Sequence, residues 1–167
     1  MSKKIEIVEH KLFKIIGKCA DKLNMKAFVV GGWVRDFLLN RHLDKVEFDI
    51  VCNDDGILLA STVAKELNIK KVNIYKNFGT AALNYKNINL EFNGARKESY
   101  KKASRNPKIE KGTIKDDQNR RDFTINAMSI SINKNSFGDL IDPFNGKIDI
   151  KNKIIKTPLN PDKTFSD

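Results

Sequence analysis

The stretch from residue 27 to residue 51, AFVVGGWVRDFLLNRHLDKVEFDIV, determines which fold this chain can adopt. It opens on four apolar residues that predict a short buried strand, and this strand stops at Gly31 and Gly32. Residues 33–40 place apolar side chains three or four positions apart, which is the spacing of a helix. Residues 46–51 alternate between apolar and polar side chains and predict a second strand. The segment is therefore a strand, a glycine turn, a helix and a strand.

Outside this unit the chain continues to alternate helical and strand patterns. Apolar residues at helical spacing predict a helix over residues 5–24, upstream of the unit. The patterns downstream predict a capped helix ending near Leu67, strands over 71–75, 80–85 and 88–93, a Lys-rich mobile loop over 97–117, a helix over 120–131 and short elements over 140–157. This order predicts an α+β fold in which a mixed β-sheet carries its helices mainly on one face.

Composition limits the class of protein. With 167 residues, of which 40% are hydrophobic, the chain has the size of one domain with a modest core. The formal net charge of +10 favours a polyanionic partner such as RNA, although lysines on a solvated surface would give the same charge. No apolar run approaches the roughly 18 residues of a membrane-spanning helix, and the N-terminus lacks a signal-peptide core. Cys19 and Cys52 lie in apolar stretches and indicate buried thiols in a reducing, cytoplasmic compartment.

Three carboxylates fall on predicted strands with their side chains directed away from the core. The apolar side chains of residues 46–51 point to one face, so Glu47 and Asp49 share the other face, and Glu91 repeats the pattern in the strand 88–93. Neighbouring carboxylates repel each other, but Mg²⁺ reverses this penalty because it prefers carboxylate oxygens. Phosphoryl-transfer enzymes use such clusters to hold two metal ions. An ordinary solvated strand face would alternate in the same way, so this interpretation also stays open.

The glycine turn is suited to an anionic ligand. Gly31 and Gly32 end a strand and begin a helix, so their backbone N–H groups are open to a phosphate. Arg35 lies off the apolar face of the helix and can reach the same anion. A plain strand–turn–helix with a surface arginine is the alternative.

A second polar group is predicted in the helix over residues 120–131. Asp122 and Asn126 are four residues apart and would share a face that is able to bind a ribose or a base edge. Arg120 and Arg121 precede them and would contact phosphates. A helix start with two exposed arginines would give the same pattern.

Together these motifs resemble the class II tRNA nucleotidyltransferase and poly(A) polymerase family. The resemblance covers roughly residues 25–165 and rests on GGWVRDFLLNR at 31–41, EFDIV at 47–51, LEFNGARKESY at 90–100, RRDFTINAMS at 120–129 and DPFNGKIDIKNKIIKT at 142–157. It implies a nucleotidyltransferase-type mixed sheet in which Glu47, Asp49 and Glu91 are the catalytic, metal-binding carboxylates. It also implies nucleotide contacts at Gly32, Arg35, Arg121, Asp122 and Asn126.

The activity that the resemblance implies is transfer of CMP or AMP from CTP or ATP to an RNA 3′ end, with tRNA as the expected substrate. The implied cofactor is a pair of Mg²⁺ ions, for which Mn²⁺ can substitute. A poly(A) polymerase shares every motif and is an alternative. A non-catalytic RNA- or nucleotide-binding protein is another, because the family usually has Asp where this chain has Glu47. Residues 1–167 correspond to the head domain alone, so the resemblance implies a fragment that ends before the neck and is inactive or unable to select a base.

Overall fold

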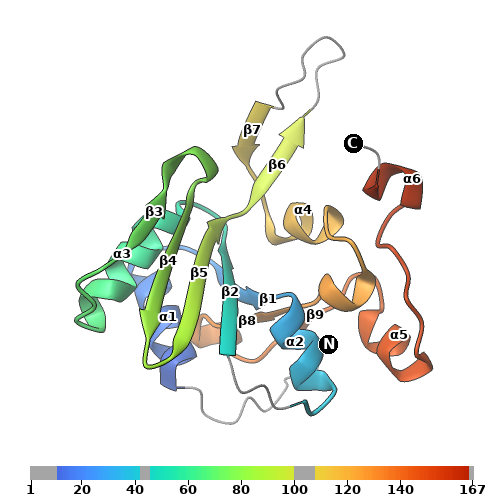
Figure 1. Ribbon diagram of the computed structural model, residues 1–167, viewed down its shortest axis with the longest axis horizontal. Helices are drawn as coiled ribbons and strands as arrows, with labels where there is room; N and C mark the ends of the chain where they lie inside the picture. The colour runs from blue at the N-terminus through green and yellow to red at the C-terminus, as the bar shows by residue number, and fades with distance from the viewer. Residues whose placement is uncertain (1–10, 42–45, 100–107, 166–167) are drawn as a thin grey trace.

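The computed structural model describes residues 11–41, 46–99 and 108–165, and a seven-stranded mixed sheet forms its centre (Figure 1). The strand order is β3-β4-β5-β2-β1-β8-β9. The bounds are β1 Ala27–Val30, β2 Val46–Cys52, β3 Asn73–Tyr75, β4 Thr80–Tyr85, β5 Ile88–Gly94, β8 Ser129–Ser131 and β9 Leu140–Ile141. Strands β2 and β5 pair in parallel, and every other neighbouring pair is antiparallel.

The remaining elements surround this sheet. The α-helices are α1 Lys11–Lys22, α2 Gly32–Leu38, α3 Gly56–Glu66, α4 Ile114–Asn119, α5 Gly146–Asn152 and α6 Pro161–Thr164. Three short 3₁₀ turns are η1 Lys76–Phe78, η2 Thr124–Asn126 and η3 Lys134–Ser136. A separate two-stranded ribbon consists of β6 Arg96–Ser99 and β7 Lys108–Lys111.

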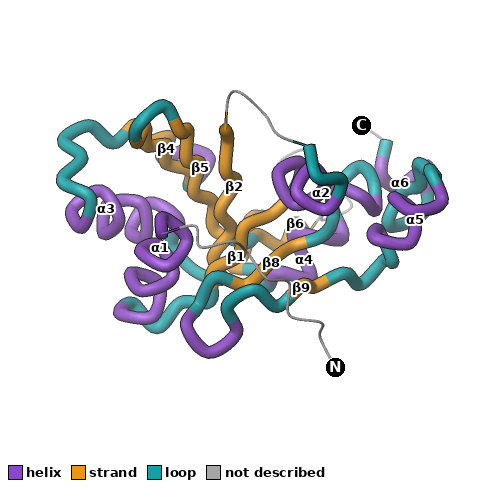
Figure 2. The backbone as a smooth tube through the Cα atoms, turned by 90° about the horizontal axis from the view of Figure 1, so that it is seen from below, coloured by secondary structure: helices purple, strands orange, loops and turns teal. Residues whose placement is uncertain are grey.

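One face of the sheet carries the main hydrophobic core. Helices α1 and α3 lie together against this face (Figure 2), as expected for an α+β fold with its helices mainly on one side. Phe48 and Ile50 of β2, and Leu90 and Phe92 of β5, are completely buried there because every second residue of a strand points the same way. Burying four such side chains contributes roughly 1.5–3 kcal/mol each relative to leaving them in water.

The opposite face is polar, apart from a small apolar cluster of Phe28, Val30, Val51 and Ala95. Ile114 of α4 packs against this cluster, so α4 covers only part of the face. The residues that alternate with the core positions of β2 and β5 are directed to this side. The fold therefore separates a hydrophobic helical layer from a face that is free to hold polar groups.

Helix α2 is fixed on the sheet by aromatic side chains. The ring of Trp33 lies 5.0 Å from that of Phe13 in α1 and 5.3 Å from that of Phe48 in β2, in edge-to-face contacts. Such pairs stabilise a protein by about 0.5–1.5 kcal/mol beyond the area that they bury. Consequently the start of α2, where the glycine turn lies, has a fixed position relative to β2.

Two sequence-based predictions were wrong. The helix over 120–131 does not form: the chain leaves α4 at residue 119, makes the turn η2 and enters β8. Pairing of β8 with β1 outweighs the local helical spacing, because tertiary contacts override weak propensities. The loop over 97–117 is largely structured, with the ribbon β6–β7 and α4 within it; residues 100–107 lie outside the described part, as do residues 5–10 of the predicted first helix.

Both cysteines are core residues, as predicted. Cys19 and Cys52 are buried and free, and burial raises the pKa of the Cys52 thiol to about 11. A thiol with so high a pKa is unreactive at neutral pH. No helix in the described ranges has the length and apolar character required to cross a bilayer.

Candidate active site

Asp49 and Glu91 lie side by side on the polar face of the sheet. They are partner residues in the only parallel strand pair of this sheet, β2 with β5. Because paired residues on neighbouring strands point to the same face, their carboxylates are adjacent. Glu47 lies two residues before Asp49 and has an exposed side chain on the same face. The register of β2 with β5 confirms the prediction that Glu47, Asp49 and Glu91 lie on the same face of the sheet.

The electrostatics of Asp49 reflect this crowding of negative charge. Burial is the largest cause that raises the pKa of the Asp49 carboxyl above its ordinary value, and the charge of Glu91 raises it further. Arg121 opposes this shift, while Glu47 and Asp117 add smaller increases. A half-buried carboxylate with a raised pKa is stabilised by any cation that binds next to it. The pair is thus a site of excess negative charge.

Gly31 lies between Asp49 and Arg121. It has a φ of +76°, and a Cβ atom there would be 2.9 Å from a guanidinium nitrogen of Arg121 and 3.4 Å from Oδ2 of Asp49. The backbone conformation therefore favours glycine, and a side chain here would also displace the Arg121 guanidinium. Its neighbour Gly32 begins α2, where an added Cβ would meet only the Arg35 guanidinium, at 3.5 Å. The predicted glycine turn therefore lies next to Asp49, one of the predicted carboxylates.

Asp117 holds both arginines of the Arg-Arg-Asp motif. Its side chain is 1% exposed, and its two oxygens accept hydrogen bonds of 2.8 Å from Arg120 Nη2 and Arg121 Nε. The helix around it is anchored by Gln118, which donates to Ser129 Oγ at 2.9 Å. Asp117 was not predicted, although its spacing of three and four residues from the two arginines is a signal that the sequence contains.

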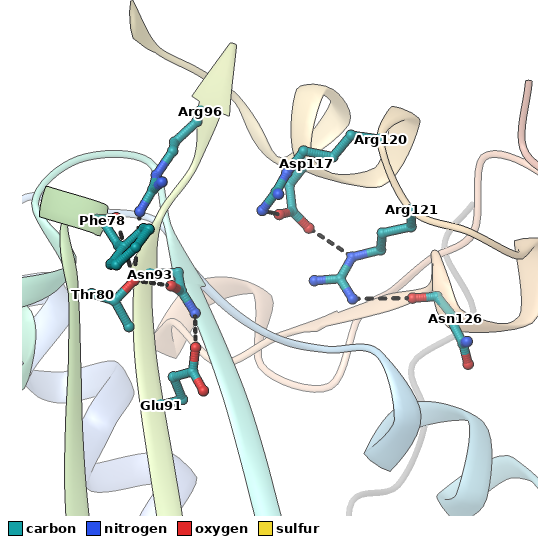
Figure 3. A network of polar contacts seen from close by, with 9 residues as sticks. All are labelled: Phe78, Thr80, Glu91, Asn93, Arg96, Asp117, Arg120, Arg121 and Asn126. Carbon is teal, nitrogen blue, oxygen red and sulfur yellow. Dashed lines mark hydrogen bonds and ion pairs between the residues drawn. The ribbon is translucent and has the colours of Figure 1, made fainter. Parts of the chain in front are cut away.

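The other predicted nucleotide contacts form a chain of hydrogen bonds. Arg35 Nη1 donates to Asn126 Oδ1 at 2.8 Å, and Asn126 Nδ2 donates to Asp122 Oδ1 at 3.1 Å. Arg121 Nη1 reaches the Asn126 carbonyl oxygen at 3.4 Å (Figure 3). Asp122 and Asn126 therefore do lie together, but through the turn η2 and not on a helix. Arg35 is further held by Asp36, with both guanidinium–carboxylate hydrogen bonds at 3.0 Å.

A second polar chain leads away from Glu91 on the other side. Asn93 Nδ2 donates to Glu91 Oε1 at 3.2 Å, and Asn93 Oδ1 accepts from Thr80 Oγ1 at 2.6 Å. Arg96 Nη2 lies 3.5 Å from the same hydroxyl (Figure 3). Glu91 and Asn93 are two residues apart on one strand face, which was visible in the sequence. Thr80 comes from β4, and only its register with β5 brings it to Asn93.

The donor set has the chemistry for a hard divalent cation, since Asp49, Glu91 and Glu47 offer only carboxylate oxygens, and burial together with the charge of Glu91 raises the pKa of the Asp49 carboxyl. In the described part of the chain, no three Asp, Glu, His or Cys side chains converge closely enough to hold a metal ion as they are placed. The adjacent pair is present, and the exposed side chain of Glu47 has to rotate to complete a group of three.

Comparison with known proteins places the chain in a family. A family model described as the poly A polymerase head domain matches residues 27–156, and the chain belongs to this family. An A-adding tRNA nucleotidyltransferase of Aquifex aeolicus is 42% identical over 137 residues, which is 82% of this chain and 16% of that protein. Another from Halalkalibacterium halodurans is 40% identical over 146 residues, which is 87% of this chain and 34% of that protein. The chain thus spans about one third or less of the length of these two relatives.

Solved structures confirm the α+β fold. A CCA-adding enzyme in its apo form II superimposes with a TM-score of 0.81 at 35% identity, over 94% of this chain and 37% of that chain. A tRNA nucleotidyltransferase complexed with a primer tRNA and an incoming ATP analog gives a TM-score of 0.75 at 37% identity, over 86% of this chain and 39% of that chain.

Proposed function

We propose that this chain is the catalytic head of a metal-dependent RNA nucleotidyltransferase that adds AMP or CMP to the 3′ end of tRNA. The observation that carries the proposal is the carboxylate pair Asp49 and Glu91, placed beside Gly31 and the guanidinium of Arg121. Two adjacent carboxylates next to a phosphate-binding group are what transfer of a nucleotidyl group requires. The relatives named A-adding tRNA nucleotidyltransferase and the structure with a primer tRNA and an ATP analog support tRNA and ATP as substrates. A tRNA substrate also favours the cytoplasm as the location.

The metal ions would be Mg²⁺ held by Asp49 and Glu91, with Glu47 as the third ligand. When bound, they would neutralise charge on the triphosphate and lower the pKa of the RNA 3′-hydroxyl. Without them the two carboxylates repel each other, and this repulsion adds to the effect of burial in raising the pKa of Asp49.

The chain's own residues orient the nucleotide. Arg121 is fixed by Asp117 and therefore presents its remaining guanidinium edge next to the glycine turn with little loss of rotamer freedom when a phosphate binds. The backbone at the start of α2 can approach the same phosphates, because no side chain intervenes at Gly31, whose own N–H donates to the Met128 carbonyl oxygen at 3.3 Å. Asp122 and Asn126, which are linked to each other, offer a carboxylate and an amide for the ribose hydroxyls.

The test is a transfer assay with labelled ATP and CTP on tRNA that lacks its terminal nucleotides, with release of pyrophosphate as a second readout. We expect incorporation that depends on Mg²⁺ or Mn²⁺ and that falls at least a hundredfold in Asp49→Asn and Glu91→Gln, the scale expected for losing a strong electrostatic stabiliser. Lys134→Gln, an exposed charge change on η3, is the matched control and should keep full activity. Addition of long A tracts to any RNA would instead identify a poly(A) polymerase, and RNA binding without pyrophosphate release would identify a non-catalytic protein.

A further inference from the structure

The carboxylate of Glu91 has an amide as its neighbour. Asn93 lies two residues further along β5, so its side chain is directed to the same face of the sheet, and its Nδ2 donates to Glu91 Oε1 at 3.2 Å. On the two flanking strands, the residue matched with Asn93 is Val51 of β2 and the residue matched with Glu91 is Ala82 of β4, and neither has a polar side chain. In the described part of the chain, Asn93 is the side chain that hydrogen-bonds to Glu91.

Thr80 determines the orientation of this amide. It lies opposite Asn93 on β4, is 8% exposed, and donates to Asn93 Oδ1 at 2.6 Å, whereas the Phe78 carbonyl is a more distant acceptor at 3.3 Å. Its oxygen lies 3.5 Å from Nη2 of Arg96, a group that can only donate (Figure 3). A carboxylate can only accept, so the reverse orientation of the amide would place Oδ1 against Glu91 Oε1. The donors of this chain therefore all point toward Glu91.

The hydrogen bond from Asn93 engages one oxygen of Glu91 and not the other. Oε2 of Glu91 accepts no hydrogen bond from the described residues. A carboxylate whose first oxygen is bound to a fixed amide presents its second oxygen to a cation, whereas a free glutamate is able to turn both oxygens toward the same ion. Asn93 therefore favours binding of a cation through one oxygen of Glu91.

The number of oxygens and their freedom to move determine which divalent cation a carboxylate site prefers. Mg²⁺ requires nearly ideal octahedral geometry, whereas Ca²⁺ takes about six to eight oxygens in flexible arrangements, with carboxylates that bind through one or both oxygens. A restrained glutamate that offers one oxygen suits the smaller ion. Glu47 is exposed and adds no such restraint, so the selectivity of the site depends on how firmly Glu91 is held.

We propose that Asn93, oriented by Thr80, is a positioning residue for Glu91, and that these two residues make the carboxylate site selective for Mg²⁺ and Mn²⁺ over Ca²⁺. This inference rests on the proposed function, since Glu91 is one of its metal-binding carboxylates. Neither Asn93 nor Thr80 is a catalytic residue, because each acts through Glu91.

The experiment measures the affinity of the whole chain for Mn²⁺ without nucleotide, by electron paramagnetic resonance of the free ion, and the displacement of Mn²⁺ by Ca²⁺. In Asn93→Ala we expect the Kd for Mn²⁺ to rise about tenfold or more, the range for losing a partner of a metal ligand. In Thr80→Val we expect a rise of about two- to tenfold, the range of one neutral hydrogen bond. In both variants the ratio of the Ca²⁺ Kd to the Mn²⁺ Kd should fall, because the released carboxylate can bind through both oxygens.

A conservative exchange and two matched controls accompany these variants. Thr80→Ser keeps the hydroxyl and should keep both the Mn²⁺ affinity and the ratio. Asn84→Ala removes an exposed amide from β4, and Thr62→Val removes a hydroxyl from α3, and both should bind Mn²⁺ and Ca²⁺ as the unchanged protein does. Thermal melting checks that each variant is folded.

Transfer assays give a second readout. In Asn93→Ala the Mg²⁺ concentration for the half-maximal rate should rise, while the KM for ATP at saturating Mg²⁺ should stay as it is in the unchanged protein. A rise in the KM for ATP at saturating Mg²⁺, with the Mg²⁺ dependence unchanged, would assign Asn93 to the nucleotide and overturn the inference.

The metal titrations separate failure of this inference from failure of the proposed function. An unchanged ratio of Ca²⁺ to Mn²⁺ affinity in folded Asn93→Ala and Thr80→Val would overturn the inference, and a lower melting temperature alone would show a purely structural role. The proposed function would still stand if Asp49→Asn abolishes Mn²⁺ binding. Mn²⁺ binding that is absent, or that Asp49→Asn leaves unchanged, would refute the metal site and both proposals. A lower ratio in both variants of a protein that releases no pyrophosphate would support the inference and refute the catalytic function.

Discussion

At the scale of single residues, the carboxylates differ in how firmly the fold holds them. Asp49 is half-buried between β1 and β5, whereas Glu47 is exposed near the start of β2. Glu91 is restrained by the Asn93 amide. In the proposed metal site, the exposed side chain of Glu47 would have the rotamer freedom to bring its carboxylate to an ion held by Asp49 and Glu91, so we expect the longer side chain to be tolerated.

Exchanges at Glu47 test this tolerance. Glu47→Asp should leave nucleotidyl transfer within about tenfold, which is roughly 1.4 kcal/mol of barrier. Glu47→Gln keeps the size but removes the charge, and should cost at least about a hundredfold. Single-turnover rates at saturating Mg²⁺ measure both. Equal rates in all three proteins would mean that Glu47 is not a metal ligand, and a strong gain in Glu47→Asp would mean that the natural residue impairs the site.

Asp49 also makes stability depend on pH. Its pKa is raised in the folded state, mainly by burial and by Glu91. The folded state therefore holds the proton more tightly than the unfolded chain, and stability falls as the pH rises from the ordinary pKa through the raised one. In the absence of metal, Asp49→Asn should melt a few degrees higher at pH 7, since about 1 kcal/mol corresponds to roughly 2–4 °C in a protein of this size.

This gain should shrink as the pH approaches 4 and Asp49 becomes protonated in the folded protein. Asp162→Asn, at an exposed aspartate of α6, is the control and should not change the melting temperature at either pH. A lower melting temperature of Asp49→Asn at pH 7 would show that the carboxylate is stabilised by Arg121 more than it is destabilised by burial.

At the scale of elements, α4 positions two arginines, because its residue Asp117 binds both Arg120 and Arg121. It begins with a capping box in which Thr113 and Asp116 exchange hydrogen bonds, and it ends immediately before Arg120. A helix of six residues is not stable by itself, so these caps and the anchoring of Gln118 keep it in place.

Asp117→Asn should therefore damage the site more than the fold. The variant keeps the size of the side chain but leaves Arg120 and Arg121 without their shared counter-ion. We expect the free energy of unfolding to fall by about 1–3 kcal/mol, the cost of a disrupted buried hydrogen-bond pair, and the KM for ATP to rise about tenfold. Denaturant titration and steady-state kinetics measure the two effects. Glu66→Gln breaks an exposed ion pair with Lys22 and should leave the stability and the KM for ATP unchanged. A loss of similar size in Glu66→Gln would show that the effect of Asp117→Asn is not specific to the arginines that Asp117 holds.

Elements that a clear apolar periodicity or a turn residue marks were predictable from the sequence. The strand β1, the helix α2 and the strand β2 follow from apolar periods and a glycine pair, and the structure has them within one or two residues. The segment after α4 was not predictable, because Phe123 and Ala127 have helical spacing by coincidence. There the Asp122 carboxylate accepts the Phe123 N–H at 2.7 Å and turns the chain toward β8. Such side chain–backbone bonds compete with helix formation and leave no period in the sequence.

The same distinction holds for the site. Glu47 and Asp49 could be assigned to one face because strand geometry is local, and Glu91 because its strand repeats the pattern. Their adjacency depends on parallel pairing of β2 with β5, which no local rule specifies. Thr80 and Arg96 reach Asn93 and each other through contacts that depend on strand register, which spacing in the sequence does not specify. Asp117 did leave a signal, its spacing of three and four residues from Arg120 and Arg121.

At the scale of the whole molecule, the candidate contacts to a nucleotide are independent of the base. They consist of the glycine backbone, guanidinium groups, a carboxylate pair and the Asp122–Asn126 pair. We expect ATP, CTP, GTP and UTP to bind this chain within a few-fold of each other, as measured by competition titration. A strong preference for ATP and CTP would show that base selection already resides in these residues.

The net charge of +10 leads to a different prediction for RNA. Contact with about two phosphates should weaken binding of a tRNA acceptor-stem minihelix with a single-stranded 3′ end about sevenfold between 50 and 200 mM salt, since each phosphate contact to a single strand contributes a slope of about −0.7. The slope is measured in a plot of log affinity against log salt concentration. A slope near zero would mean that the positive charge of the chain does not contribute to RNA binding.

The position of β1 inside the sheet has a consequence for how this protein is made. β1 pairs with β2 on one edge and with β8 on the other, and its residue Val30 is matched with Ser129, 99 positions later. At about 5–20 residues per second, a ribosome needs roughly 5–20 s to supply that partner. All three carboxylates are synthesised before Ser129, but until then one edge of an apolar strand stays open to other chains. We therefore expect the yield of folded protein to depend on translation speed and on chaperones that cover this edge during these seconds.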